Sequence, residues 1–379
     1  MNNLFFVWTP FQFFIAQNVI MQENLENNIL IEGFIGNNKH FYDSYDFMKI
    51  DSLWNKIYKI DKLPTYAGLE KKTLLKDIVK LIKYDKYISN IIKENSIGTL
   101  YLGEINNHSC QFSAFRYSKQ NIRIAFFEEG LANYYTLQIS TRGGYLLNKA
   151  VSKALDTFFF IPQYHFKYAK YVFDKSLSFK EIPINMRLSI LPVYHEQYDK
   201  QLYISNILST KLEAYIRNEY EKMKSFSCDG ETILFLSQVI DEINPNATKP
   251  LLNVLKNFFS NSIFREKLIV IKFHPRDTEN KKIQICNLFK EINLKTYILS
   301  DEYTIPVEIY LMKLKFSRII TFFSATFMYA GYIYPKIPID FLVSDFLEEC
   351  KKYKIDNKNY EKVVSDVLDM MKNLSITTN

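Results

Sequence analysis

Three short clusters of polar residues could do chemistry in this chain, and each follows a run of β-forming apolar residues. They occupy residues 127–130 (FEEG), 273–276 (FHPR) and 322–326 (FFSAT). A carboxylate can take a proton from a hydroxyl, an imidazole can protonate a departing anion, and hydroxyls can bind phosphate oxygens. The clusters therefore predict acid–base chemistry beside an anion-binding site.

The first cluster offers two adjacent carboxylates, Glu128 and Glu129, followed by Gly130. Successive strand side chains point to opposite faces, so the pair is not expected to work as the two opposed carboxylates of a glycosidase. We expect one glutamate to act as a general base and the other to cap the turn or helix that follows, with Gly130 permitting a sharp turn. The expected strand, residues 122–127, is apolar on both faces, so either glutamate can be the base.

The second cluster places His274 and Pro275 after an expected strand at residues 267–272. Pro275 ends the hydrogen-bond ladder and fixes the chain direction, while Lys272, Arg276 and Asp277 make the surroundings polar. The histidine is expected to donate to a phosphate oxygen and, as imidazolium, to protonate a departing anion; a structural role is the alternative. The other four histidines have no comparable setting, and no zinc site is predicted.

The third cluster puts Ser324 and Thr326 between an expected strand, residues 318–322, and an apolar helix, residues 327–333. Hydroxyls there can simply cap the helix. The same place directs backbone N–H groups and the positive end of the helix dipole at an anion, for which phosphate is the expected guest. The Gly-x-x-x-x-Gly-Lys pattern of a P-loop is absent, so ATP hydrolysis is not predicted.

Two further polar residues stand at expected element ends. Glu308 lies in the first turn of an expected helix at residues 306–314, where its carboxylate can accept both hydroxyls of a ribose or merely interact with the helix dipole. Gln12 follows the first expected strand, residues 4–9, in the sequence TPFQ. It is expected to reach a cleft from the N-terminal half, or to mark a plain helix start.

The elements that must position these residues alternate between strands and helices along the chain. Expected strands lie at residues 4–9, 29–35, 99–102, 122–127, 232–236, 267–272, 296–299, 318–322 and 337–341. Expected helices lie at residues 12–23, 71–86, 250–259, 281–291, 306–314 and 360–374, with a polar helical stretch around 194–224. Strands that are apolar on both faces, alternating with helices, argue for parallel sheets covered on both sides.

A chain of 379 residues exceeds what one hydrophobic core usually covers, so two domains are expected, at residues 1–190 and 191–379. The expected fold class is α/β, with two Rossmann-like domains whose parallel sheets face each other across a cleft. Ligands of such sheets bind beyond the carboxyl ends of the strands, where all three clusters fall.

Composition describes a soluble globular protein, with 47% hydrophobic and 23% charged residues. The four cysteines show no metal-ligand spacing and are expected to be free thiols in a reducing compartment. The N-terminus lacks the basic region of an export signal, and no apolar stretch of about 18 residues follows, so the expected location is cytoplasmic.

The net charge of +7 is modest, and basic residues gather on an expected amphipathic helix from Lys71 to Lys86. A solvated helix face is the plain interpretation. Attraction of this helix to the anionic lipid on the cytoplasmic face of a membrane is the functional one. A nucleic-acid partner is not expected, because no recognition motif or strongly basic domain is present.

The three clusters, in this order and spacing, resemble the signatures of bacterial sialyltransferases with the GT-B fold: an acidic-acidic-Gly motif, then His-Pro, then a Ser/Thr motif. The nearest resemblance is to glycosyltransferase family 52, the lipooligosaccharide sialyltransferases, and the related polysialyltransferases share the motifs. The resemblance spans nearly the whole chain. It implies an N-terminal acceptor-side domain and a C-terminal domain that binds CMP, the nucleotide of the donor.

Residue by residue, the resemblance implies that Glu128 or Glu129 is the general base. It implies that His274 contacts the donor phosphate and protonates it, and that Ser324 and Thr326 hold that phosphate. Two departures from the pattern stand out. The acidic pair is Glu-Glu where relatives can carry Asp-Asp, and the hydroxyl motif is Ser-Ala-Thr rather than Ser-Ser, which makes the second hydroxyl the less secure contact.

The remaining implied roles are donor binding by Pro275, Glu308 and Ser237, with Glu308 on the ribose, and cleft positions for Gly130 and Gln12. Asp241, after the strand at residues 232–236, is a reserve candidate for the base.

The activity implied is inverting transfer of sialic acid from CMP-sialic acid to a terminal sugar, with galactose expected, of lipooligosaccharide or capsule. The donor carries one phosphate, so neither a metal nor a cofactor beyond the donor is expected. The acceptor is a glycan or glycolipid, and a homodimer is conceivable. One alternative is a GT-B transferase with another nucleotide-sugar donor. The other is a non-catalytic, membrane-associated subunit of an envelope-glycan assembly, motivated by the Lys-rich helix.

Overall fold

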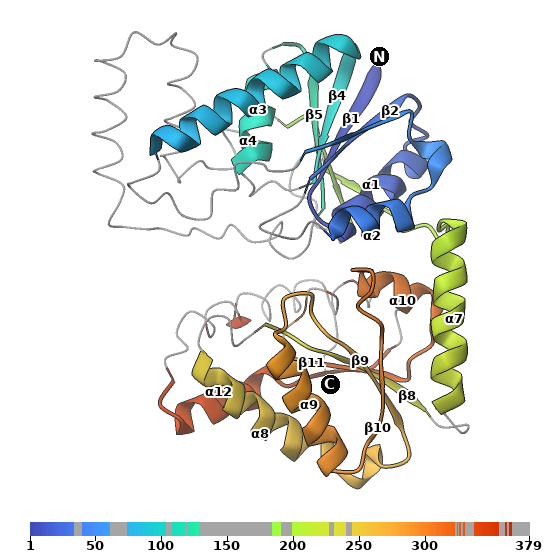
Figure 1. Cartoon of the computed structure of the whole chain (residues 1–379), viewed down its shortest axis with the longest axis vertical. Helices are drawn as coiled ribbons and strands as arrows, with labels where there is room; N and C mark the ends of the chain where they lie inside the picture. Colours follow the sequence, from blue (N-terminus) through green and yellow to red (C-terminus); the bar gives the residue numbers. More distant parts are fainter. Residues whose placement is uncertain are drawn as a thin grey trace. The chain divides into compact units, whose positions relative to one another are not determined.

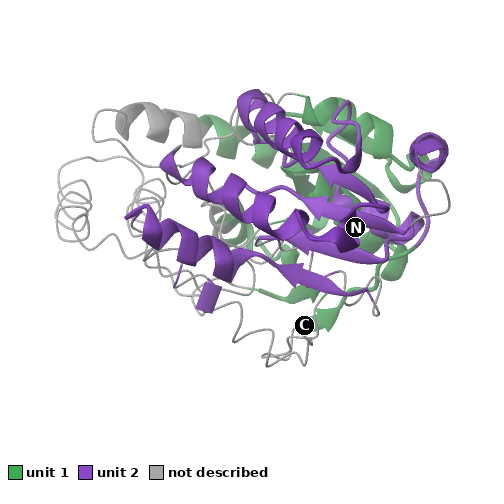
Figure 2. Ribbon diagram, turned by 90° about the horizontal axis from the view of Figure 1, so that it is seen from below, with its two compact units in different colours: residues 1–205 green, residues 206–379 purple. Residues whose placement is uncertain are grey.

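The computed structural model describes residues 1–33, 40–60, 74–103, 108–118, 120–128, 184–190, 199–226, 231–239, 245–322, 324, 326, 329, 337–355, 361 and 364–365. The chain forms two compact units, Met1–Ser205 and Asn206–Asn379 (Figures 1 and 2). Each unit is built on its own parallel sheet.

The sheet of the first unit contains seven parallel strands in the order β3-β2-β1-β4-β5-β6-β7. The strands are β1 (Asn2–Val7), β2 (Asn28–Glu32), β3 (Lys56–Lys59), β4 (Ile97–Leu102), β5 (Arg123–Phe127), β6 (Met186–Ser189) and β7 (Asp199–Gln201). The chain begins in the middle of the sheet, runs outward to β3 and then returns to β4 on the other side of β1. The strand order therefore reverses between β1 and β4.

Helices cover both faces of this sheet. The helices α1 (Pro10–Gln22) and α2 (Phe41–Met48) lie on one face, and α3 (Leu74–Glu94) and α4 (His108–Ser118) lie on the other (Figure 1). The helix α1 starts at once after β1, because Thr9 accepts a hydrogen bond from the backbone N–H of Gln12 and Pro10 fills the first helical position.

Large apolar side chains fill both layers of the first unit. Leu4 and Phe6 of β1 join the core beneath α3 and α4. On the opposite face the ring of Phe5 stacks on Tyr101, with centroids 4.3 Å apart, and meets the edge of Trp54. Burying each such side chain stabilises the fold by about 1.5–3 kcal/mol.

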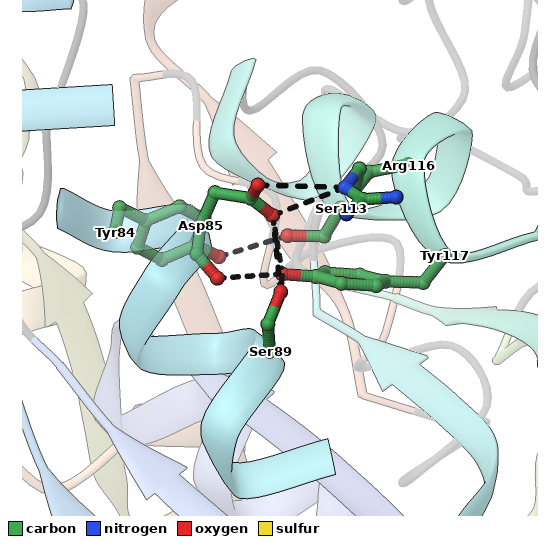
Figure 3. A network of polar contacts seen from close by, with 6 residues as sticks. All are labelled: Tyr84, Asp85, Ser89, Ser113, Arg116 and Tyr117. Carbon is green, nitrogen blue, oxygen red and sulfur yellow. Dashed lines mark hydrogen bonds and ion pairs between the residues drawn. The ribbon is translucent and has the colours of Figure 1, made fainter. Parts of the chain in front are cut away.

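A buried polar network fastens α3 to α4 (Figure 3). The Asp85 carboxylate accepts hydrogen bonds from Arg116 Nε at 3.2 Å and from the Tyr117 hydroxyl at 2.9 Å. One residue earlier on α3, the Tyr84 hydroxyl and Ser113 Oγ lie 2.8 Å apart. These charge-assisted bonds connect one residue of α3 to two residues of α4.

The sheet of the second unit has five parallel strands in the order β10-β9-β8-β11-β12. They are β8 (Thr232–Leu236), β9 (Leu268–Lys272), β10 (Lys295–Ile298), β11 (Arg318–Thr321) and β12 (Ile339–Phe341). Here the order reverses between β8 and β11.

The helices of the second unit are α7 (Thr210–Phe226), α8 (Thr248–Phe259), α9 (Glu279–Glu291), α10 (Val307–Lys313) and α12 (Val343–Lys352). The helices α8, α9 and α12 cover one face over a shared apolar core, in which Phe235 meets Phe259 and Phe289 edge-on (Figure 1). On the opposite face, the ammonium of Lys272 lies 5.6 Å from the centroid of the Tyr310 ring on α10.

The predicted α/β class with two parallel sheets is confirmed. The predicted strand 232–236 matches β8, and the other predicted strands overlap observed ones. The division falls at Ser205, whereas the sequence predicted residue 190, because β7 lies beyond residue 190 and still joins the first sheet. The stretch expected to be helical around 194–224 holds β7 and only then α7. Most of the helix predicted at 360–374 lies outside the described residues.

Candidate functional site

In the second unit, three of the predicted residues follow three neighbouring parallel strands at one sheet edge. His274 follows β9, Ser237 follows β8 and Ser324 follows β11, with β8 in the middle. The backbone N–H of Ser237 donates to the carbonyl of Lys272 at 3.0 Å, which ties the first two strand ends together. Adjacent strands lie about 4.8 Å apart, so roughly 10 Å separates the backbones at the two outer strands. This edge includes the reversal between β8 and β11, where such sheets bind ligands.

His274 occupies the first position of a tight turn with Pro275 second. The backbone N–H of Asp277 donates to the carbonyl of His274 at 2.9 Å, and the backbone N–H of Arg276 donates to His274 Nδ1 at 3.1 Å. Since Nδ1 accepts a hydrogen bond, a neutral ring carries its proton on Nε2. The conformation therefore leaves Nε2–H as the donor of this imidazole.

The charge state of His274 differs from the one used in the sequence interpretation. Burial, and next the neighbouring Arg276 guanidinium, lower the pKa of His274 to about 4. The ring is therefore neutral at pH 7, whereas the sequence interpretation invoked the imidazolium. A bound phosphate dianion would favour the charged ring and raise this pKa.

Asp277 and Lys281 hold this turn. From the sequence, Asp277 was counted only among the polar neighbours of His274, and Lys281 was not named. Asp277 Oδ2 accepts from the backbone N–H of His274 at 2.9 Å, and Asp277 Oδ1 pairs with Lys281 Nζ at 2.8 Å. Lys281 Nζ also donates to the carbonyl of Gln238, just beyond β8. The only sequence signal was an aspartate three residues after the histidine, followed by Thr278, whose side chain caps α9.

The hydroxyl cluster and Glu308 are in direct contact. Thr326 Oγ1 donates to Glu308 Oε1 at 3.0 Å, and the backbone N–H of Thr326 donates to Ser324 Oγ at 3.3 Å. Glu308 is buried on α10, and burial raises the pKa of its carboxyl group, against bonds from its own backbone and from Thr326 that lower it. The Thr326 hydroxyl is thus engaged by Glu308.

Two hydroxyls at the strand-order reversal are buried without a hydrogen-bond partner among the described residues. They belong to Ser237, after β8, and to Thr321, the last residue of β11. An unpaired buried hydroxyl costs about 1–3 kcal/mol, so a ligand or water oxygen reaching either would be stabilising. Ser237 was predicted as a donor contact, and Thr321 was not.

In the first unit, Glu128 is buried directly after β5. Its Oε2 accepts a hydrogen bond from the backbone N–H of Ile190, just beyond β6, at 2.5 Å. The carboxylate thereby fastens the ends of two neighbouring strands, a contact different from the turn or helix cap that the sequence allowed one of the two glutamates. Glu129, Gly130 and Asp241 lie outside the described residues.

Gln12 sits where the strand order of the first sheet reverses. Its Oε1 accepts from the backbone N–H of Trp8 at 2.7 Å, and its side chain presses on Gly103, after β4, where an added Cβ would come within 2.7 Å. Its Nε2 is buried and has no partner among the described residues. The structure thus places Gln12 at the strand-end edge of unit 1, buried rather than exposed.

Of the predicted basic helix, Lys83 and Lys86 are exposed on α3. Lys71 and Lys72 lie outside the described residues. Within the described part of the chain, no helix is long and apolar enough to cross a membrane. No group of three His, Cys, Asp or Glu side chains among the described residues could hold a metal ion.

Solved structures share the fold at low sequence identity. A UDP-GlcNAc 2-epimerase from Neisseria meningitidis, bound to UDP-GlcNAc, is 13% identical, with a TM-score of 0.50 over 97% of this chain and 99% of that one. A protein of Listeria monocytogenes, assigned to the same enzyme type, is 9% identical, with a TM-score of 0.51 over 89% of this chain and 78% of that one. The fold is therefore of the GT-B type, with two Rossmann-like domains in one chain.

A comparison with curated protein sequences finds no match. A family model described as alpha-2,8-polysialyltransferase (POLYST) matches residues 3–342, which is most of the chain and includes all three motif clusters. Two related families were named from the sequence, glycosyltransferase family 52 and the polysialyltransferases. The family model matches the polysialyltransferases, and the likeness to family 52 remains a resemblance of motifs. The chain belongs to the alpha-2,8-polysialyltransferase family.

Proposed function

We propose that this protein is an inverting sialyltransferase that moves sialic acid from CMP-sialic acid to a terminal sugar of a bacterial surface glycan. The observation that carries the proposal is the family match over residues 3–342. The α-2,8 linkage in the family name favours a terminal sialic acid as acceptor, and therefore growth of a sialic acid chain. The terminal galactose expected from the sequence is the second candidate acceptor.

The reaction is a single displacement. A glutamate of the pair Glu128–Glu129 takes the proton of the acceptor hydroxyl while that oxygen attacks C2 of the donor sugar. The bond from C2 to the phosphate oxygen breaks, and its electron pair stays on the phosphate. His274 Nε2–H donates a hydrogen bond to that oxygen. For proton transfer the ring must first take up a second proton, which the anionic phosphate favours; it then gives one proton to the departing CMP and is left as the neutral imidazole. Attack from the face opposite the leaving group converts the β-linked donor into an α-sialoside.

The phosphate contacts we assign are His274 Nε2 and Ser324 Oγ, with Ser237 beside them and Glu308 on the ribose. A single phosphate carries little enough charge for such donors to stabilise, and one preorganised donor of this kind is worth about 3–4 kcal/mol in the barrier. We therefore expect transfer to proceed without a divalent metal, so that EDTA leaves the initial rate unchanged.

The direct test supplies CMP-sialic acid with glycans ending in sialic acid or in galactose, and follows CMP release and product mass. We expect release with the sialic-acid-terminated glycan and a loss of about 10²–10⁴-fold in kcat for His274→Ala, the range of one general acid. The absence of CMP release with every acceptor, together with the absence of a rise in Tm with CMP, would contradict the proposal.

A thermal-shift panel of CMP, UDP and GDP separates this donor from other nucleotide sugars, since a ligand that binds the folded state stabilises it by mass action. Stabilisation by UDP or GDP alone would point to another donor. A non-catalytic role in glycan assembly predicts that cells carrying Glu128→Gln or His274→Ala keep their surface glycan, whereas the transferase predicts its loss.

A further inference from the structure

The turn that carries His274 is closed by two hydrogen bonds between the same two residues. The backbone N–H of Asp277 donates to the carbonyl of His274, and Asp277 Oδ2 accepts from the backbone N–H of His274, both at 2.9 Å. Pro275 in the second position fixes its own φ, as β-turns favour. In the turn closed this way, the backbone N–H of Arg276 stands 3.1 Å from His274 Nδ1.

The carboxylate of Asp277 is itself held by a buried cation. Lys281 lies in the first turn of α9, four residues after Asp277. Its Nζ is 2.8 Å from Asp277 Oδ1, and the two side chains are 1% and 0% exposed. The same Nζ donates to the carbonyl of Gln238, the neighbour of Ser237. These contacts connect the end of β8 to the histidine through one ion pair that water does not screen.

We propose that Asp277, anchored by Lys281, is a positioning residue for the transfer reaction. It holds the turn in the shape that places the Arg276 N–H on Nδ1 and so keeps the proton of the neutral imidazole on Nε2. The inference rests on the proposed function, in which His274 donates to the donor phosphate. A ring locked in one tautomer presents its donor without reorganising when the phosphate leaves.

The carboxylate of Asp277 matters for its two acceptor oxygens, not only for its shape. One oxygen serves the His274 N–H and the other serves Lys281. An asparagine keeps the size but has one acceptor oxygen, so in Asp277→Asn either the turn or the lysine loses its partner.

The test measures steady-state kinetics and the ¹⁵N spectrum of histidine-labelled protein for Asp277→Asn. A general acid contributes about 10²–10⁴-fold, so we expect its misplacement to lower kcat about 10- to 100-fold. The His274 resonances should change from an Nε2–H tautomer to a mixture. The matched control is Asp340→Asn, which breaks the 2.8 Å ion pair to Arg318 in the same unit and should keep both kcat and the tautomer.

A second variant separates positioning from folding. Removing one partner of a buried ion pair destabilises a protein, whereas replacing both is often tolerated. We therefore expect Asp277→Asn/Lys281→Met to regain part of the Tm lost in Asp277→Asn while kcat stays low. Recovery of kcat together with Tm would make Asp277 a structural residue and overturn the inference.

Two further outcomes distinguish a failure of the inference from a failure of the proposed function. If His274→Ala is inactive and Asp277→Asn is as active as the wild type, the inference fails and the transferase stands. If His274→Ala itself keeps full activity, the assigned phosphate donor is wrong, and the inference falls with it.

Discussion

The imidazole of His274 has to serve two purposes that a single charge state cannot serve. As a neutral ring with its proton on Nε2, it can hydrogen-bond a phosphate oxygen, and its pKa of about 4 keeps it in that state before the donor binds. To transfer a proton, the ring must instead be the imidazolium, because only the charged ring is acidic enough to protonate the oxygen that leaves. Hydrogen bonding and proton transfer should therefore be separable by mutation.

The variant His274→Gln makes this separation. A glutamine amide retains an N–H donor at similar reach but cannot transfer a proton at neutral pH. We expect the Kd for CMP to stay within about threefold of the wild-type value, while kcat falls about 100-fold. Calorimetry with CMP and an initial-rate assay check this, with His274→Ala as the variant that loses both. A wild-type kcat in His274→Gln would mean that a hydrogen bond suffices.

Glu32 is a buried carboxyl group that the proposed chemistry does not use. It lies at the end of β2, its nearest cation is Lys59 Nζ at 3.9 Å, and burial raises its pKa from 4.5 to about 7. The folded state therefore binds the proton more tightly than the unfolded state does. This contribution to stability is complete below about pH 4.5 and is lost as the pH rises through 7.

We accordingly expect Glu32→Gln to be more stable than the wild type at pH 8, and the difference to shrink toward pH 5. At about 1.4 kcal/mol per pKa unit, the gain is at most about 3 kcal/mol. Thermal unfolding from pH 5 to 8 measures it, with the exposed Glu26→Gln as the control that should show no such trend. A gain that does not vary with pH would rule out titration of Glu32 as its cause.

At the level of elements, the contact between α3 and α4 determines how the basic helix is held. The bonds of Asp85 to Arg116 and Tyr117 fix the middle of α3 (Figure 3). The nearby Lys83 and Lys86 are exposed. A helix fixed in this way presents its lysines without an ordering cost when it meets an anionic surface.

We propose that α3 contacts the cytoplasmic face of the bacterial inner membrane, and Lys83→Glu/Lys86→Glu tests this. Each basic residue near an anionic surface contributes about 1 kcal/mol, so reversing two charges should weaken binding to vesicles containing phosphatidylglycerol at least about tenfold. Vesicle sedimentation measures it. Lys211→Glu/Lys224→Glu makes the same charge change at exposed lysines of α7. An equal loss of vesicle binding in both variants would mean that net charge causes the effect, and not the position of the lysines on α3.

Strands of the two sheets were predictable to different degrees. The run Thr232–Leu236 could be located from the sequence because four of its five residues are buried apolar side chains. The strands β3 (Lys56–Lys59) and β7 (Asp199–Gln201) could not, since they are sheet edges that pair through backbone bonds and carry charged residues. Missing β7 also moved the predicted domain boundary.

The candidate site shows the same division. His274, Ser237 and Ser324 were predictable because each follows a recognisable strand, and parallel strand ends meet at one edge. Asp277 and Lys281 were not, since a charged pair four residues apart at a helix start is usually a solvated surface pair. Only the fold shows that both side chains are buried.

For the molecule as a whole, the two units are alike in plan. In each, the first strand stands inside the sheet and the strand order reverses beside it, between β1 and β4 and between β8 and β11. Gln12 lies at the first reversal, and Ser237 and Thr321 flank the second.

The chain has two tryptophans, and Trp8 and Trp54 are both buried in the first unit. Excited at 295 nm, the protein therefore emits from that unit alone, with its twenty-seven tyrosines largely silent. The emission maximum should shift to the red when the Met1–Ser205 half unfolds and should not respond when only the other half does. Paired with far-ultraviolet circular dichroism, one denaturant titration can assign each melting step to its half of the chain.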